Sequence, residues 1–510
     1  MDYLIRFSTQ HESFRLAEIE ALTQLVNIKN GLQSMVAVEI LEYSLVSPFC
    51  IVRFSLGSSD GSAVSTEQDV HDAVISFMSR SIQAKAIYEL WGSGSDYESL
   101  HTDVRARSQH LWSRYQHDVR FKFSIDSYFG KRSAGEQREI INQFAYFGFQ
   151  GKVDMKRPDQ EWCLMEEWES PLHLSSNGLA ENRNIDRDNQ PSCEVDGRLP
   201  ANTTSKQPRR IILGRKITSS RRYLVEKHDL KKRPYISTTS MDAELALITA
   251  TLALASPGKL FLDPFCGTGG FMVAAAELGA VVLGSDIDGR SFRGKGEGVE
   301  KGVGRNMKFY GIDALFGDCL TSDLTNTPLR RSRVRWLDGI IADIPYGVRE
   351  GLKVLGRKQP IKEGAEEGGL VKQPHKIGGV LAHTLPGYIA PKKPYSFSKL
   401  LENILDFAAR TLVDSGRLAF WMPTANENEE GEQRSAATPR HALLELKHES
   451  VQRFNKWSRR LLVYERVVGE FDDAALKGDA LIPVVNGTSA DELNPFRRRY
   501  FQSFAKEPNG

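Results

Sequence analysis

The sequence contains few cysteines, and none lies close to another. Only five occur among 510 residues, and no Cys-x-x-Cys pair is present (Cys50, Cys163, Cys193, Cys266 and Cys319). This scatter excludes a disulfide framework and a cysteine-based zinc knuckle, and it favours a reducing compartment. We therefore expect no metal site in this chain.

Long hydrophobic runs are also missing. No uninterrupted apolar stretch reaches the roughly 18 residues that a membrane-spanning helix needs. The opening residues, MDYLIRFSTQHESF, carry charges too early for the apolar core of a secretory signal. These absences predict a cytosolic or nuclear protein that does not enter a membrane, and of the two we expect a cytoplasmic location.

The sequence also lacks a large excess of positive or negative charge. The formal net charge is +2, although 26% of the residues are charged and 40% are hydrophobic. This composition is ordinary for a globular protein, and the length suggests two to four domains. Nucleic-acid contacts must therefore come from local patches. Between Lys206 and Arg233 eleven Lys or Arg residues occur with only two acids, which predicts either a phosphate-binding stripe or an ordinary solvated surface.

The first 170 residues predict one or two small α+β units. They contain three strand-like runs, at 35–40, 49–56 and 119–125, and helical spacing at 71–83 and 134–143. Residues 175–207 are polar and poor in aromatic side chains, which is typical of a linker or a mobile loop.

From about residue 241 onward, predicted helices alternate with strands, which indicates βαβ units and a parallel sheet. The helices are expected at 241–255, 271–278 and 397–412, and the strands at 259–262, 280–285, 339–342 and 417–421. Residues 351–394 are too long for an ordinary loop and predict an insertion. Residues 452–468 predict a closing hairpin, and the tail carries one basic-aromatic motif, FRRRYF at 496–501.

A glycine-rich turn, LFLDPFCGTGGF at 260–271, connects a strand to a helix. Gly267 and Gly269 would let a ligand approach the backbone, and the start of the helix offers free N–H groups. The dinucleotide pattern Gly-x-Gly-x-x-Gly is absent, and Asp263 at the strand end would repel a pyrophosphate. A carboxylate there suits a cationic ligand such as the amino-acid part of S-adenosylmethionine. The plainer alternative is a structural turn.

Two further acids strengthen the cofactor interpretation. Asp286 ends the next strand in GSDID, where an acid can accept both ribose hydroxyls. Asp318, in GIDALFGDCL, is a candidate acceptor for the adenine amino group. Asp288 is either part of this site or an ordinary helix N-cap. An acid at the end of each of three successive strands favours a cofactor site over a simple turn.

The stretch DIPYG at 343–347 predicts a pocket for a flat, polar ring. Asp343 closes the fourth strand at the carboxyl edge of the sheet, where open α/β sheets bind ligands. Residue 344 precedes Pro345, so it is extended and directs its carbonyl beside the Asp343 carboxylate. These two oxygens can grip an exocyclic NH2 while Tyr346 stacks on the ring, which promotes nitrogen attack on a sulfonium methyl. The plainer alternative is a turn with a helix cap.

These motifs resemble those of a known family. DPFCGTGG, GSDID and DIPYG are similar to the motifs of Rossmann-like S-adenosylmethionine-dependent amino methyltransferases, whose signature is Asp/Asn-Pro-Pro-Tyr/Phe/Trp. With KRPYISTTSMDAELAL (232–247) and GFQGKVDMKRPDQEW (148–162), the chain more narrowly resembles the eukaryotic tRNA guanosine-10 N2-methyltransferases, from the N-terminus to about residue 468. Ile344 departs from the signature, which has proline there, but the pre-proline restraint survives.

The resemblance implies an α/β fold in which a Rossmann-like class I methyltransferase domain follows α+β ferredoxin-like and THUMP domains. The implied parts are a ferredoxin-like part (1–70), a THUMP RNA-binding domain (71–174), a flexible linker or loop (175–207), the methyltransferase domain (208–470) and a C-terminal tail (471–510). It also implies methylation of the guanine 2-amino group in tRNA. The implied partner is a small zinc-binding activator subunit, for which the hairpin at 452–468 is a candidate docking surface.

The resemblance also assigns roles to single residues. It implies cofactor-binding roles for five of them (Asp263, Gly267, Gly269, Asp286 and Asp318), catalytic roles for three (Asp343, Pro345 and Tyr346) and substrate-binding roles for four (Arg233, Tyr235, Thr239 and Ser240). Two alternatives stay open: methylation of another base amine, such as adenine N6 in DNA or a base in rRNA, and a non-catalytic RNA-binding scaffold. An RNA-gripping N-terminal half favours RNA over DNA, and the intact acids argue against the scaffold.

Overall fold

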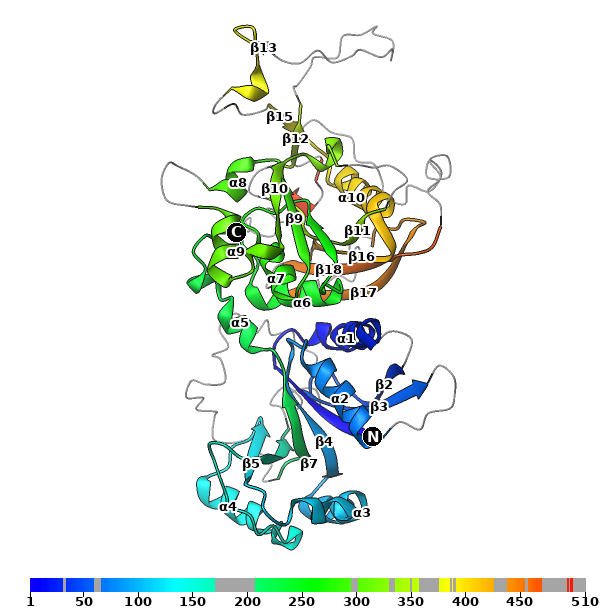
Figure 1. The fold of residues 1–510 in the computed structure, drawn as a ribbon, viewed down its shortest axis with the longest axis vertical. Coiled ribbons are helices and arrows are strands. Elements are labelled where there is room, and N and C mark those ends of the chain that lie inside the picture. The colour runs from blue at the N-terminus through cyan, green and yellow to red at the C-terminus, as the bar shows by residue number, and fades with distance from the viewer. Residues whose placement is uncertain are drawn as a thin grey trace, which may run out of the picture. The chain divides into compact units, whose positions relative to one another are not determined.

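The computed structural model divides into two compact units, residues 1–228 and 229–510 (Figure 1). The structure describes residues 1–30, 34–58, 66–169, 207–294, 301–329, 335–348, 351–356, 376–385, 388, 391–425, 438–454, 457–469, 493–494 and 496–498. Almost all of the predicted linker at 175–207, and much of the 351–394 insertion and of the tail, therefore lie outside the described residues. Within the described ranges, no helix is long and apolar enough to cross a membrane.

The first unit is built on one seven-stranded sheet with the order β2-β3-β1-β4-β7-β6-β5. Its first part runs β-α-β-β-α-β with β1 between β3 and β4, which is the ferredoxin-like arrangement. Its elements are β1 (Asp2–Phe7), α1 (Arg15–Asn30), β2 (Ser34–Glu42), β3 (Phe49–Ser58), α2 (Glu67–Met78) and β4 (Ala84–Gly94). Helix α2 begins at a capping box, in which the Thr66 side chain and the Asp69 side chain each bond the other's backbone N–H.

The rest of the first unit extends the same sheet beyond β4. Its elements are α3 (Tyr97–Ser108), β5 (Phe121–Tyr128), α4 (Ala134–Asn142), β6 (Gln160–Glu167), β7 (Arg210–Ser219) and α5 (Tyr223–Lys227). Its core is aromatic: Trp91 and Trp162 are fully buried with ring centroids 5.4 Å apart. The predicted helix at 134–143 and the predicted strands of this unit appear within a few residues of their expected bounds.

The structure places two domain boundaries differently from the prediction. The expected boundary at 70/71 falls inside α2, and β4 pairs with both β1 and β7, so the ferredoxin-like and THUMP parts share one sheet. The methyltransferase domain was expected from 208, but β7 pairs with β4 and β6 in the first sheet, and the second unit starts at residue 229. The pairing of β7 joins strands far apart in the sequence, so local pattern does not reveal it.

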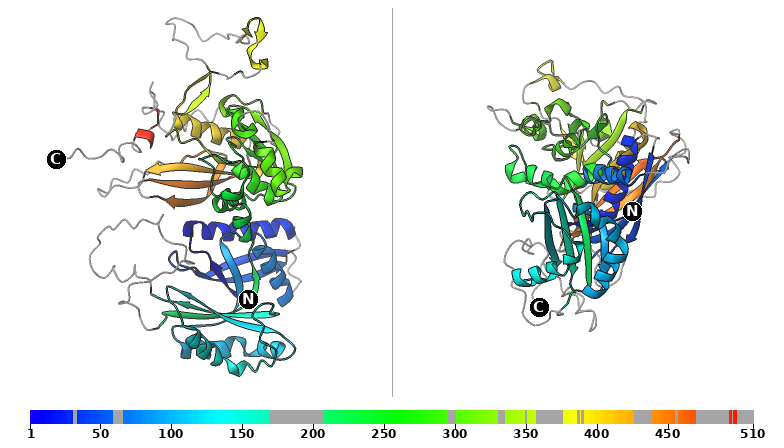
Figure 2. Two further views of the ribbon diagram at one scale, coloured as in Figure 1. Left: turned by 90° about the vertical axis from the view of Figure 1, so that its left-hand side faces the viewer. Right: turned by 60° about the horizontal axis from the view of Figure 1, so that its bottom comes forward.

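The second unit contains a seven-stranded sheet with the order β10-β9-β8-β11-β16-β18-β17. The first five strands in this order are parallel, and β18 runs antiparallel to both of its neighbours (Figure 2). The strands are β8 (Leu260–Asp263), β9 (Val281–Asp286), β10 (Phe316–Thr321), β11 (Leu337–Asp343), β16 (Leu412–Ala425), β17 (Leu444–Arg453) and β18 (Trp457–Arg466). Because β9 and β10 lie to one side of β8 and β11 and β16 to the other, the topological switch point falls between β8 and β11.

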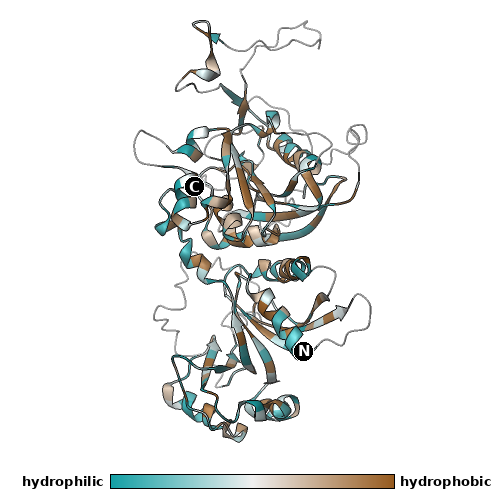
Figure 3. Cartoon of the chain, in the orientation of Figure 1, coloured by the Kyte–Doolittle hydropathy of each residue, from teal (hydrophilic) through white to brown (hydrophobic). Residues whose placement is uncertain are grey.

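Helices cover both faces of this sheet, as in a Rossmann-like fold. They are α6 (Ala243–Leu252), α7 (Gly270–Glu277), α8 (Gly289–Arg293), α9 (Val303–Tyr310) and α10 (Phe397–Thr411). On β16, Phe420 packs in the core cluster with α10, whereas Trp421 donates from Nε1 to Thr249 Oγ1 on α6 at 3.1 Å. Successive side chains of a strand point to opposite faces, so α10 and α6 lie on opposite sides of the sheet. Hydrophobic residues line the central strands (Figure 3), and the predicted α/β fold class is confirmed.

Two smaller features complete the second unit. Within the predicted insertion at 351–394, β12 (Lys353–Leu355) pairs with β15 (Lys392–Pro394), and β13 (Lys376–Ile377) with β14 (Val380–Leu381). The closing hairpin begins at Leu444, eight residues before the predicted start at 452. The sequence of β17, LELKHESVQR, is largely polar because β17 is an edge strand, so it lacks the apolar signal of an inner strand.

Candidate active site

The glycine turn after β8 has a shape that only glycine permits at one position. Gly269 has φ +78°, and a Cβ added there would lie 2.7 Å from Cγ1 of Val303. The turn is fixed by two backbone bonds, from Cys266 N to Ser285 O at 2.9 Å and from Gly269 N to Cys266 O at 2.7 Å. It therefore holds the start of α7 against the end of β9, as the sequence predicts for a ligand-binding turn.

Asp286, at the end of β9, connects the glycine turn to the next loop. Its Oδ2 accepts a hydrogen bond from Gly267 N at 3.0 Å, and its Oδ1 accepts one from Asp288 N at 2.8 Å. Asp288 is the N-cap of α8, where its Oδ1 accepts from Arg290 N at 3.1 Å. Of the two readings of Asp288, the structure therefore supports the helix cap, and Asp286 is the acid that faces the turn.

Three carboxylates converge at the switch point of the sheet. Burial raises the pKa of Asp263 well above its ordinary value, and the nearby charges of Asp286 and Asp343 raise it further. Burial also raises the pKa of Asp286. Negative charge on these acids is therefore poorly compensated, and a cation placed beside them would stabilise their ionised forms. The donor set fits the cationic ligand predicted from the sequence.

Asp343 and Tyr346 form a half-buried pair at the end of β11. The Tyr346 hydroxyl donates to Asp343 Oδ1 at 2.6 Å. Burial raises the pKa of Asp343 to about 6, although the hydrogen bond from Tyr346 and the charge of Arg459 oppose the shift. A carboxyl with such a pKa can accept a proton at neutral pH. The hydroxyl of Tyr346 thus makes a contact with Asp343 that the sequence did not predict, whereas stacking of its ring on a base stays a prediction.

Ile344, the departure from the family signature, has a packing role. Its side chain is 1% exposed and belongs to the hydrophobic core cluster, which also contains Leu352 and Leu400. A larger apolar side chain thus anchors the loop by burial at the position where the signature has a proline ring. Residues 344–347 lie outside helices and strands, so the carbonyl of Ile344 is free of strand pairing.

The segment before α6 is pinned to the glycine turn through Asn306. Tyr235 N donates to Asn306 Oδ1 at 3.0 Å, and Asn306 Nδ2 donates to Tyr235 O at 2.8 Å and to Thr268 O at 3.4 Å. Ser240 Oγ lies 2.8 Å from Thr268 Oγ1. A Cβ on Gly270 would lie 3.7 Å from Nη1 of Arg233, which places this guanidinium at the start of α7. Three of the four predicted substrate residues therefore border the turn.

Thr239 and Asp318 fit the predicted site less well. Thr239 is exposed, and its Oγ1 lies 3.2 Å from Ser237 Oγ within the same loop. Asp318 lies inside β10, where a register shift gives it φ +135°, and its Oδ1 accepts from Cys319 N at 2.7 Å. Asp318 is exposed and does not end its strand, in contrast to the prediction. The reason is that β10 continues beyond Asp318 and pairs with β9 as far as Thr321.

The basic stretch between Lys206 and Arg233 does not form one continuous charged surface. Arg215 and Arg233 are buried, and Arg215 Nε lies 2.8 Å from Glu89 Oε2. Several other members are paired with acids: Arg209 with Glu167, Arg210 with Glu42, and Lys216 with Glu161. Most of its described charges in the first unit therefore stabilise the sheet, and Lys206 lies outside the described residues.

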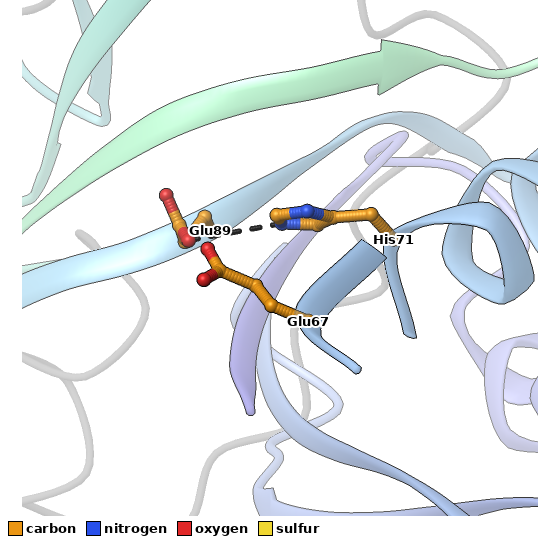
Figure 4. Close-up of side chains that lie close together, drawn as sticks. All are labelled: Glu67, His71 and Glu89. Carbon is orange, nitrogen blue, oxygen red and sulfur yellow. Dashed lines mark ion pairs between the residues drawn. The ribbon is translucent and has the colours of Figure 1, made fainter. Parts of the chain in front are cut away.

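Elsewhere in the described part of the chain, one cluster has the composition of a metal site. Glu67 and His71 on α2 point toward Glu89 on β4, with their ligand atoms within 4.8 Å of one another (Figure 4). Each carboxylate also meets a guanidinium, Arg114 at 2.8 Å from Glu67 and Arg215 at 2.8 Å from Glu89. Because two positive charges already balance the two acids, the cluster is better described as an ion-pair network than as a site for a divalent cation.

Comparisons with protein families agree with this geometry. Residues 1–181 match the family described as Tmrp11 THUMP N-terminal domain, and residues 231–317 match the RMKL-like methyltransferase domain. The second match covers β8, the glycine turn and β9. The fold and the site together therefore define a Rossmann-like methyltransferase with a THUMP-type N-terminal unit.

Similar proteins show to which family of methyltransferases the chain belongs. The tRNA (guanine(10)-N(2))-methyltransferase of Saccharomyces cerevisiae is 38% identical over 98% of this chain and 99% of its own length. The protein of the same name in Schizosaccharomyces pombe is 32% identical over 98% of this chain and 96% of its own. Among solved structures, TrmN from Thermus thermophilus covers 92% of this chain and 100% of its own at 15% identity, with a TM-score of 0.37. The chain belongs to the tRNA (guanine(10)-N2)-methyltransferase family.

Proposed function

We propose that this protein transfers a methyl group from S-adenosylmethionine to the N2 amino group of guanosine 10 in tRNA. The observation that carries the proposal is the convergence of Asp263, Asp286 and the Asp343–Tyr346 pair at the switch point of the second sheet. Similarity along almost the whole chain to relatives named for this reaction supports the choice of base and position.

The cofactor is proposed to bind at the glycine turn. Asp263 would face its cationic amino-acid part, because a positive charge would offset the desolvation cost of this carboxylate and its repulsion from Asp286 and Asp343. Asp286 would accept the ribose hydroxyls, since two backbone N–H groups already orient its carboxylate. Gly267 and Gly269 would allow close approach of the backbone. Asp318 is left out of this set because it is exposed and lies within its strand.

The catalytic step is proposed to take place between Asp343, Ile344 and Tyr346. When bound, S-adenosylmethionine supplies an electrophilic methyl group on a sulfonium. The Asp343 carboxylate and the Ile344 carbonyl accept the two hydrogens of the guanine NH2, so the nitrogen lone pair is directed at the methyl carbon. Taking up the methyl group in exchange for the sulfonium bond would leave positive charge on the nitrogen. The proton then passes to Asp343, whose pKa of about 6 far exceeds that of an aromatic ammonium.

Pro345 and the segment before α6 are proposed to shape the opening for the base. Pro345 restricts residue 344 to an extended conformation and so fixes the direction of its carbonyl. Arg233, Tyr235 and Ser240 border the glycine turn through the contacts described above, which supports a role in guiding the substrate. Thr239 has the weakest structural support of the four residues predicted for this role.

We further propose a cytoplasmic location and a small zinc-binding activator as partner subunit, on the basis of the sequence resemblance. The hairpin suggested as its docking surface offers little room for strand pairing. Strand β18 is already paired on both sides, with β16 and β17, so within the hairpin only the outer edge of β17 has no strand partner among the described residues.

The test is methyl transfer to unmodified tRNA, with and without the activator, followed by mass spectrometry of the nucleosides. We expect N2-methylguanosine, and its loss when guanosine 10 of the substrate is replaced by adenosine. Methyladenosine, or methylation that survives this replacement, would indicate a different base or position. Tight tRNA binding without any product under both conditions would leave only the RNA-binding scaffold.

A further inference from the structure

Residues near the C-terminus contact the loop that follows β11. Asn494, which is 2% exposed, donates from Nδ2 to Tyr346 O at 2.7 Å. Arg497 donates from Nη1 to Gly347 O at 2.7 Å and also to Val348 O. Two side chains from about 150 residues further along the chain therefore hold three successive carbonyls, immediately after the Asp343–Tyr346 pair.

These two side chains are themselves fixed by their surroundings. Asn494 Oδ1 accepts a hydrogen bond from Arg497 N at 3.1 Å, so one amide group both caps the short helical turn and holds the loop. Leu493 O accepts from Phe397 N at 3.2 Å, which attaches the segment to the start of α10. We call Asn494, Phe496 and Arg497 the clamp residues.

Aromatic contacts extend the clamp to the catalytic tyrosine. The ring of Phe496, which is buried, lies 6.1 Å from that of Trp457 on β18, and Trp457 lies 6.1 Å edge-on from Tyr346. The Trp457 ring also stacks on Phe454 at 4.5 Å. Backbone and ring of Tyr346 are therefore both connected to the clamp residues, the backbone by Asn494 and the ring through Trp457.

Gly347 shows that the loop and the clamp are fitted to each other. Its φ is +69°, which disfavours any other residue, and a Cβ there would lie 2.9 Å from Asn494 Nδ2 and 3.0 Å from Cγ of Leu352. Gly347, which follows Tyr346, thus permits both the left-handed backbone conformation and the close approach of Asn494.

We propose that Asn494 and Arg497 are positioning residues for methyl transfer, which hold the 344–348 loop so that Asp343 and the Ile344 carbonyl keep their geometry. This inference rests on the proposed function for its catalytic consequence, but not for the contacts themselves. A loop outside helices and strands needs external support, because a displacement of about 1 Å at a reacting group can cost up to a hundredfold in rate. Phe496 and Arg497, the first two residues of the basic-aromatic motif in the tail, are thereby given a role.

The first experiment compares Arg497→Ala with Arg497→Lys and with the matched control Arg498→Ala. Arg498 is exposed on the same turn, so the control removes the same charge without touching the loop. Full-length protein with its activator is assayed on unmodified tRNA. We expect Arg497→Ala to lower kcat about tenfold with KM for tRNA within about twofold, Arg497→Lys to retain most of the activity, and Arg498→Ala to match the wild type. If both alanine variants raise KM equally and leave kcat unchanged, the arginines act only as tRNA-binding charges and the inference is wrong.

The second measurement does not depend on activity. Hydrogen–deuterium exchange of peptides covering 344–348 should become faster in Asn494→Ala and in Arg497→Ala but not in Arg498→Ala. In the two loosened variants, water entering beside Asp343 should also move the acid limb of the kcat/KM profile to lower pH. Unchanged exchange in both clamp variants would overturn the inference. If exchange responds but wild-type protein methylates no tRNA, the contacts stand, and it is the proposed function, with the positioning role built on it, that fails.

Discussion

The pKa values of acids removed from solvent shift in opposite directions in the two units. In the first unit, Glu166 is fully buried, and Arg132, Tyr97 and Ser127 lower its pKa although burial acts in the other direction. Glu89, also buried, has its pKa lowered to about 2 against the effect of burial, through His71, Arg215 and Trp91.

In the second unit, the acids at the strand ends, of which Asp263 is buried and Asp286 and Asp343 are half-buried, have raised pKa values. Burial is the largest cause for Asp263, Asp286 and Asp343 alike, and for Asp263 neighbouring carboxylates add to it. A buried acid whose charge is fully compensated contributes to folding, whereas one left uncompensated is prepared to bind a cation or to accept a proton. The comparison thus separates structural acids from candidate catalytic ones, and the following predictions test it.

The largest effect should come from the acid assigned to the amine. Asp343→Ala should abolish methyl transfer, with a loss of at least about a thousandfold in kcat, because it removes both the hydrogen-bond acceptor and the proton acceptor. Cofactor affinity, measured by calorimetric titration, should stay roughly unchanged. A parallel loss of affinity and rate would move Asp343 into the cofactor site and remove its catalytic assignment.

The next largest difference should be in how substitution of each kind of acid affects the stability of the folded protein. Glu89→Gln should destabilise the folded state by about 3 kcal/mol, because it leaves the buried Arg215 charge unpaired, whereas Asp263→Asn should leave stability unchanged or raise it. The free energy of unfolding in denaturant titrations gives the comparison. Equal losses in both variants would show that the carboxylates at the strand ends are compensated as well.

The pH dependence of stability should also differ between the two kinds of acid. The folded pKa of Glu89 lies below its ordinary value of 4.5, so its stabilising effect is present above that pH and is lost as pH falls toward about 2. For Asp343 the sign is reversed: with a folded pKa of about 6, its cost to stability appears as pH rises from 3.8 through 6. Unfolding free energies of Glu89→Gln and Asp343→Asn at several pH values, each compared with the wild type, would show whether the two windows exist.

A smaller effect is expected on the pH profile of activity. The acid limb of kcat/KM should lie near pH 6, since Asp343 must be ionised to accept the amine hydrogens. Tyr346→Phe removes a hydrogen bond that favours the ionised carboxylate, so the limb should move to higher pH in this variant. A limb that stays in place would mean that another group controls the titration.

The smallest effect concerns the basic stretch. Lys231→Ala, at an exposed position, should weaken tRNA binding about twofold and reduce the salt slope by up to about one unit per lost phosphate contact. The control is Lys216→Ala, whose ammonium lies 3.3 Å from Glu161 and should matter less for RNA. Equal salt slopes in both variants and the wild type would assign the whole stretch to a solvated or structural surface.

Much of the catalytic unit could be predicted because its signals are local. Each helix or strand, the glycine turn at 260–271 and DIPYG is encoded by a short run of residues, and the strand ends of a parallel sheet meet at one edge. Asp318 was misplaced because the end of β10 is set by its pairing with β9, which continues to Thr321 and cannot be read from GIDALFGDCL alone. Likewise, the pattern of the N-terminal half could not show that β7 returns to pair with β4.

The sequence by itself determined the class of this protein, its fold type and the acids around which a cofactor and an amine would meet, since short-range patterns and local backbone preferences encode them. Only the tertiary structure decided which acids lie close enough to raise one another's pKa, which arginines are buried in ion pairs, and that Asn494 holds Tyr346 across 148 residues. The physical reason is that burial and long-range hydrogen bonds exist only after the chain has folded, and these contacts determine the charge state of each carboxylate.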